Sequence, residues 1–138
     1  MLFDTHAHYD DKQFDPDREE LLNGMEAEGI GLIVNAASTV ESWEKIRLLT
    51  EEYPLIYGSV GVHPDELGAL DEIQFRRMEE LLDLEKIVAV GEIGLDYYWD
   101  KERHDIQKEW FVRQLELARR KDMPVMIHSR EAAADRCV

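Results

Sequence analysis

The sequence predicts an α/β fold with a parallel sheet of the (β/α) TIM-barrel type, of which roughly the first five strands of eight are present. Short apolar, β-branched runs alternate with longer stretches of helical periodicity, so each strand is followed by a helix and then by a parallel strand. The runs are apolar on both faces, as is typical of sheets that helices cover. Four of the five histidines stand where such runs end, at the edge where side chains of a barrel converge.

Five strands and four complete helices are predicted, with a fifth helix beginning at Arg130. The predicted strands are Met1–Phe3, Gly31–Ala36, Leu55–Val62, Ile87–Ile93 and Pro124–Ile127. In the first helix, Asp15 is expected to cap, Pro16 to occupy the first turn and Gly29 to end it. The helical positions expected to be buried are Leu21, Leu22 and Met25, then Trp43, Ile46, Leu49 and Tyr53, then Phe75, Met78 and Leu82, and finally Ile106, Trp110, Phe111, Leu115, Leu117 and Ala118.

The composition and net charge limit which classes of protein the chain can belong to. With 44% apolar and 34% charged residues, the chain is expected to be globular. Its net charge of −15 repels polyanions at long range, so any contact with nucleic acid must be local. The single cysteine, Cys137, excludes an internal disulfide and suits a reducing compartment. No leader pattern and no membrane-spanning apolar run is present, so a cytoplasmic location without membrane contact is expected.

Side chains of the metal-ligand type follow the predicted strands. His6 and His8 are one residue apart, so on a strand they face the same side, about 6–7 Å apart along the backbone. His63 follows the third strand and His128 the fifth. Glu92 lies among apolar residues at the end of the fourth strand, where an unpaired carboxylate would be costly to bury and a cation would compensate its charge.

The distance between the first and fifth strands separates two parallel folds. In an open sheet with sequential strand order these strands lie about 19 Å apart, because adjacent strands are about 4.8 Å apart. No single metal centre spans that distance. In a barrel the two strands face each other across one mouth, so the histidines favour barrel curvature.

Four motifs together resemble the TatD-type metal-dependent deoxyribonucleases of the amidohydrolase superfamily. They are Leu2–Asp10 (LFDTHAHYD), Gly61–Pro64 (GVHP), Gly91–Tyr98 (GEIGLDYY) and Pro124–Arg130 (PVMIHSR). The resemblance implies a (β/α)₈ barrel of about 250 residues, of which residues 1–138 would be a single domain and the N-terminal half. In that family an acidic residue often stands at the position of Ala134, where Asp135 is the nearest acid here.

The resemblance also implies a two-metal site. His6 and His8 would hold one divalent ion, Glu92 would bridge to a second, and His128 would bind that second ion, with Glu92 and His128 as catalytic residues. In the family, a histidine from the sixth strand and an aspartate from the eighth complete the site, and neither has a counterpart here. Mg²⁺ or Mn²⁺ is implied, although imidazole and carboxylate donors suit Zn²⁺ as well.

Four further residues are expected to support this site. His63 and Arg130 are candidates for contact with a substrate phosphate, the latter because a guanidinium group donates two parallel hydrogen bonds. Asp4 and Asp96 are expected to orient the ligand histidines from behind. Each has a plainer interpretation: His63 in a turn before Pro64, or Arg130 on the surface of a helix. His104 is expected to be exposed to solvent.

The resulting hypothesis is phosphodiester hydrolysis of DNA at single-stranded or frayed ends, by water that two divalent ions activate. A second hypothesis keeps the barrel but makes the substrate a small amide, ester or lactone, as in amidohydrolase relatives. A third is a half-barrel without catalytic activity, whose unpaired strand edge and apolar wall favour self-association.

Overall fold

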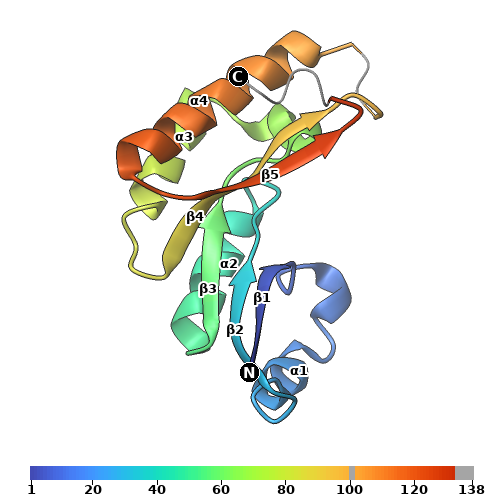
Figure 1. Ribbon diagram of the computed structural model, residues 1–138, viewed down its shortest axis with the longest axis vertical. Coiled ribbons are helices and arrows are strands. Elements are labelled where there is room, and N and C mark those ends of the chain that lie inside the picture. The colour runs from blue at the N-terminus through green and yellow to red at the C-terminus, as the bar shows by residue number, and fades with distance from the viewer. Residues whose placement is uncertain (100–101, 133–138) are drawn as a thin grey trace.

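The computed structural model describes residues 1–99 and 102–132 and shows one parallel sheet with helices on its convex side (Figure 1). The strands are β1 (Leu2–Ala7), β2 (Ile30–Asn35), β3 (Ile56–Val60), β4 (Ile87–Asp96) and β5 (Val125–Arg130). The helices are α1 (Arg18–Gly24), α2 (Ser42–Glu52), α3 (Glu72–Leu81) and α4 (His104–Lys121), with short 3₁₀ helices η1 (Lys12–Phe14) and η2 (Pro64–Ala69). The strand order β1-β2-β3-β4-β5 follows the chain, and every pairing is parallel. The predicted partial barrel of five strands is confirmed.

Two apolar clusters join the helices to the sheet. The larger lies under α3 and α4, where Phe111 and Leu117 pack with Ile93 and Leu95 of β4. The smaller lies near the N-terminus, and its members include Leu22 of α1. Since the side chains of a strand alternate between faces, burial of Ile93 and Leu95 against the helices leaves Glu92, Gly94 and Asp96 on the concave face.

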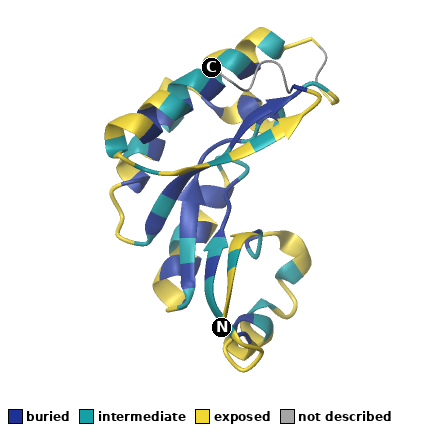
Figure 2. Cartoon of the chain, in the orientation of Figure 1, coloured by how far each residue is buried: buried dark blue, intermediate teal, exposed yellow. Residues whose placement is uncertain are grey.

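The two edge strands differ from the central ones. Figure 2 shows β3 and β4 largely buried, whereas much of β1 and β5 is exposed. Leu2 and Phe3 of β1 are 67% and 64% exposed, and Ile127 of β5 is 50% exposed. The expectation of strands covered on both faces therefore holds for the central strands and is wrong for the edges.

The start of the first helix differs from the prediction. The helix begins at Arg18, so Asp15 and Pro16 stand in the preceding turn. The carboxylate of Asp15 accepts a hydrogen bond from Arg18 Nη2 at 2.6 Å, which engages it in an ion pair rather than as a cap. Gly29 does not end the helix, which finishes at Gly24. Gly29 instead has a left-handed φ of +84° in the turn before β2.

Helix α4 also corrects two expectations. Ile106 is exposed because the neighbouring Gln107 takes the buried position, where its side chain bonds the backbone of Asp96. His104 is partly buried rather than solvent-exposed, because its ring stacks on Tyr97 with 3.7 Å between centroids. The buried positions predicted for α2 and α3 are confirmed.

The fifth helix does not begin at Arg130, which is the last residue of β5 and pairs with Asp96 of β4. Ala134, Asp135 and Cys137 lie outside the described residues. Among the described helices, none has the length and apolar character that crossing a membrane requires.

Candidate metal centre

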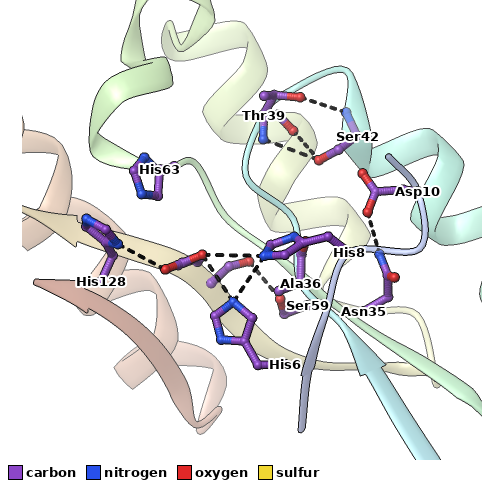
Figure 3. A network of polar contacts seen from close by, with 12 residues as sticks. His6, His8, Asp10, Asn35, Ala36, Thr39, Ser42, Ser59, His63 and His128 are labelled. Carbon is purple, nitrogen blue, oxygen red and sulfur yellow. Dashed lines mark hydrogen bonds and ion pairs between the residues drawn. The ribbon is translucent and has the colours of Figure 1, made fainter. Parts of the chain in front are cut away.

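Three potential ligands from two distant strands meet on the concave face of the sheet. His6 Nε2 lies 3.2 Å from His8 Nε2 and 3.2 Å from Glu92 Oε2, and His8 Nε2 lies 3.9 Å from the same oxygen. The dashed lines of Figure 3 converge between these rings. His6, on β1, and His8, directly after it, thus face the same way, as the sequence predicts, and the curl of the sheet brings the end of β1 into contact with β4.

A hydrogen bond determines which nitrogen of His8 faces this cluster. Its Nδ1 lies 2.9 Å from the carbonyl oxygen of Ala36, directly after β2, and a carbonyl only accepts, so Nδ1 carries the proton. The lone pair of Nε2 is then directed toward His6 and Glu92. This is the tautomer that binds a metal through Nε2.

Glu92 lies between the two sides of the site. While Oε2 faces His6 and His8, Oε1 lies 3.2 Å from His128 Nδ1. The backbone at this point is anchored, since Glu92 N donates to the carbonyl of Ala37 at 2.6 Å. A carboxylate with its two oxygens directed at separate imidazoles has the disposition of a bridging ligand.

Asp96 holds the other edge of the His128 ring. Its Oδ2 lies 2.9 Å from His128 Nε2, so the protonated Nε2 donates to it and the Nδ1 lone pair faces Glu92. Burial acts to raise the pKa of Asp96, which is 1% exposed, but hydrogen bonds from His128 and from the amides of Trp99 and Tyr98 bring the pKa below its ordinary value. The carboxylate therefore remains charged at neutral pH.

The buried Gln107 fixes Asp96 in turn. Its Oε1 accepts from Asp96 N at 2.8 Å and its Nε2 donates to Asp96 O at 2.9 Å. Gln107 is not among the predicted site residues, although a glutamine on the apolar stripe of a helix indicates a buried hydrogen-bond partner.

The separations within the cluster fit a cation. Ligand atoms about 2.1 Å from one ion lie about 3.0–3.4 Å apart in octahedral or tetrahedral geometry. The two separations of 3.2 Å around His6 match this range, and a second set consists of His63, Glu92 and His128, with each set's ligand atoms within 4.8 Å of one another. The donors around His6 thus have the spacing of ligands to one ion between β1 and β4, and the second set, whose His63 follows β3, gathers potential ligands for another ion beside Glu92.

His63 lies nearer to this centre than the sequence indicates. Its ring centroid is 4.2 Å from that of His128 in an edge-to-face arrangement, and its Nδ1 accepts from Asp65 N at 3.3 Å. Burial, and then the electrostatic effect of the neighbouring His128, lower the pKa of His63 below its ordinary value, so the His63 ring is neutral at neutral pH. Contact with a substrate phosphate and metal ligation are both chemically available to it.

Arg130 and Asp4 make contacts of another kind. The Arg130 guanidinium lies over the ring of Tyr98, 4.0 Å from its centroid. Asp4 Oδ1 accepts from the backbone amide of His6 at 3.1 Å, so its described contact holds the strand rather than the imidazole ring. The roles predicted for both residues stay predictions.

The loop after β1 is held by a pair that sequence reasoning missed. Asn35, fully buried at the end of β2, donates from Nδ2 to Asp10 Oδ1 at 2.7 Å and accepts from Tyr9 N. A polar residue that ends an apolar strand is the signal that identifies such a pair. The pair keeps the backbone next to His8 in place.

A cavity of about 420 Å³ opens beside the cluster. Its lining consists of His8, Asp10, Asp11, Gln13, Ser38, His63, Asp65, Glu66 and Glu92. Most of these side chains are acidic, so the cavity attracts cations and, without them, repels an anionic substrate.

A curled parallel sheet that gathers imidazoles around a carboxylate at its strand ends has this cluster where (β/α)₈-barrel enzymes have their active sites. The chain belongs to the TatD family: the family model "TatD related DNase" matches residues 3–137. The resemblance seen in the four motifs is thereby confirmed.

Several relatives share the sequence over nearly all of this chain. It is 42% identical over 135 residues to the "uncharacterized metal-dependent hydrolase YabD" of Bacillus subtilis, covering 98% of this chain and 53% of the relative. It is 32% identical to the "3'-5' ssDNA/RNA exonuclease TatD" of a Pantoea species, covering 95% and 51%. The chain spans about half the length of the curated relatives it matches.

The fold agrees with solved structures. The crystal structure of YjjV, a TatD homologue from Escherichia coli, superposes with a TM-score of 0.88 at 34% identity, covering 95% of this chain and 51% of that one. A TatD family hydrolase from Entamoeba histolytica superposes with a TM-score of 0.84 at 22% identity, which supports the fold alone.

Proposed function

We propose that this chain carries the metal-binding half of a divalent-metal-dependent hydrolase that cleaves phosphodiester bonds in single-stranded DNA or frayed ends. One observation carries the proposal: the two oxygens of Glu92 face His6 on one side and His128 on the other, each at 3.2 Å. A relative named as a 3'-5' ssDNA/RNA exonuclease supports the substrate class.

Each residue has a proposed role. His6 and His8 hold one ion, and Glu92 bridges the two ions. His128 holds the second ion through Nδ1, while Asp96 keeps the proton of the His128 ring on Nε2. When bound, two divalent ions lower the pKa of a shared water and neutralise charge on the attacking and leaving oxygens of a phosphodiester. Mg²⁺ or Mn²⁺ is proposed, with Zn²⁺ compatible with the same donors.

The proposed substrate contacts come from the rim. His63 lines the cavity, and its partly buried ring is placed to donate a hydrogen bond to a phosphate oxygen. Arg130 offers a guanidinium at the end of β5. Because Asp10, Asp11, Asp65 and Glu66 line the same cavity, binding of a polyanion requires that cations be bound first.

The test compares metal binding and cleavage in matched variants. Titration calorimetry with Mn²⁺ should show binding that Glu92→Gln and His6→Ala each weaken by at least about tenfold. Cleavage of a labelled single strand by a full-length relative should require Mn²⁺ or Mg²⁺ and be lost when the residues equivalent to Glu92 and His6 are replaced in the same way. Unchanged metal binding in Glu92→Gln would refute the proposal, as would a relative that cleaves small esters but no oligonucleotide.

The exposed edges support a second proposal, that copies of this chain associate through β1 and β5. Leu2 and Phe3 at one edge and Ile127 at the other present apolar surface beside strand backbone with which no other described strand pairs. Light scattering should show a mass that rises with concentration and falls in Phe3→Asp, but not in Ile73→Asp, which alters an equally exposed residue of α3. A monomer at all concentrations would refute this association.

A further inference from the structure

An exposed aromatic pair follows β4 at the rim of the metal centre. Trp99 is 66% exposed and Tyr98 40% exposed, and their rings meet edge to face with centroids 4.6 Å apart. The contrast with Trp43 is clear, since that indole is 3% exposed and its Nε1 donates to the carbonyl of Gly61. Neither Tyr98 nor Trp99 belongs to the two core clusters, so their surface is available for contact with another molecule.

The guanidinium group of Arg130, on the neighbouring strand β5, lies against this aromatic pair. The Arg130 guanidinium carbon lies 4.0 Å from the centroid of the Tyr98 ring and 5.5 Å from that of Trp99. Arg130 pairs in register with Asp96, which places it at the end of β5 beside the aromatic pair. A guanidinium held against a ring keeps its N–H donors at its edge, where a phosphate can accept them.

The same carboxylate that orients His128 also holds this group. Asp96 Oδ1 accepts from the amides of Tyr98 at 3.0 Å and Trp99 at 3.2 Å, while Oδ2 lies 2.9 Å from His128 Nε2. On β5, His128 and Arg130 are two residues apart and therefore share a face. The aromatic pair and the metal centre thus form one connected unit.

The negative charge of the chain means that binding of a polyanion needs a contribution other than long-range electrostatic attraction. With a net charge of −15 and an acidic cavity at the centre, the chain has no long-range attraction for a polyanion. Stacking on an aromatic ring does not depend on net charge, and it strengthens binding by about 5- to 150-fold per base.

We propose that Tyr98, Trp99 and Arg130 form a stacking platform that receives an unpaired nucleobase, with Arg130 contacting the adjoining phosphate. The inference rests on the proposed function and deepens it. A base inside a duplex has both faces covered by its neighbours, whereas a base of a single strand or frayed end has a free face. The platform therefore selects single-stranded ends through the base rather than the backbone.

The test compares two strands that differ only in their bases. A short labelled oligothymidylate with phosphorothioate linkages, which resist cleavage, and an abasic strand of equal length are titrated in Mn²⁺ and followed by anisotropy. We expect the base-bearing strand to bind about tenfold more tightly and to quench tryptophan fluorescence. The difference should disappear in Trp99→Ala and persist in Trp99→Phe and in Ile73→Ala, the latter altering a similarly exposed apolar residue on α3.

Salt provides a further readout. Raising the salt concentration should weaken binding of both strands alike and leave their ratio unchanged, because only the backbone contacts release counterions. Equal affinities for the two strands, or a ratio that Trp99→Ala leaves intact, would overturn the platform. The proposed function is judged apart from it, by Mn²⁺ binding to this chain and its loss in Glu92→Gln, and by metal-dependent cleavage of an ordinary oligonucleotide by a full-length relative.

Discussion

Gly94 and His128 face each other in register across β4 and β5, and a Cβ added to Gly94 would lie 1.9 Å from the carbonyl oxygen of His128. Gly94 also has a backbone φ of +151°, which residues other than glycine rarely adopt. The position of a proposed metal ligand thus depends on the absence of a side chain on the neighbouring strand.

Replacing this glycine should move β5. Gly94→Ala is expected to destabilise the fold by at least about 2 kcal/mol, because backbone rather than a flexible side chain occupies the space. Urea unfolding gives the stability, and Mn²⁺ titration should show weaker binding because His128 moves. Gly68→Ala is the control, since beyond its two chain neighbours no atom of the described residues lies within 4 Å of its added Cβ. Similar effects of the two substitutions would contradict this account.

The Asp96 carboxylate should govern metal affinity without touching the metal. Asp96→Asn is expected to weaken Mn²⁺ binding by about 10–100-fold, because an amide no longer enforces protonation of His128 at Nε2. Calorimetry measures the affinity. Asp83→Asn, which alters an ion pair with Lys121, serves as the control and should leave metal affinity unchanged. Equal metal affinities for Asp96→Asn and the parent chain would show that the ring needs no such orientation.

Metal binding should stabilise the folded chain. At a free concentration of Mn²⁺ a hundredfold above Kd, we expect a gain of about 2.7 kcal/mol, visible as a higher Tm that EDTA reverses. His8→Ala should remove this gain because it deletes a ligand. His104→Ala should retain it, since His104 stacks on Tyr97 and is not in either ligand set. A Tm that does not respond to metal would argue against both sets.

The ion pair between Glu72 and Arg113 should make stability depend on pH. Arg113 donates to both carboxylate oxygens, at 2.6 and 2.7 Å, and joins α3 to α4 while its guanidinium lies over Phe75 and Trp110. This hydrogen bonding lowers the pKa of Glu72 in the folded chain. Its contribution is therefore present at neutral pH, above the pKa of the unfolded chain, and is lost as the pH falls through the lowered pKa of Glu72 in the folded chain.

Urea unfolding of the parent and of Glu72→Gln checks this sign. The variant should be the less stable at pH 7, and the two should converge in acid, where the native carboxylate is also protonated. Glu28→Gln, an exposed acid before β2, should follow the parent at every pH. A difference that grows on acidification would show that the pair acts with the opposite sign.

The placement of the histidines at the strand ends was predictable because it follows from the geometry of strands and of parallel sheets. Alternation of side chains on a strand places His6 and His8 on one side, and helical crossovers make the neighbouring strands parallel. From these two facts, and from the need to bring His128 to the same metal centre as His6 and His8, the curvature follows. The structure confirms it through the contacts of Glu92 with His6 and His128.

The errors concern residues whose state depends on partners distant in the sequence. Periodicity placed Ile106 in the core, whereas two hydrogen bonds to the backbone of Asp96 draw Gln107 there instead. His104 is covered by Tyr97, and Asp15 is paired with Arg18 rather than with a helix amide. Local propensity is a weak guide wherever such a partner competes.

The amino-acid order alone specified the alternation of strands and helices and the identity of the ligand-type side chains, because both depend on local periodicity. Folding in three dimensions decided which atoms face each other: the tautomer of His8 through Ala36, the orientation of His128 through Asp96, and the closeness of β5 to β4 at Gly94. Each of these contacts joins segments far apart in the chain, so only the packing of the folded chain determines it.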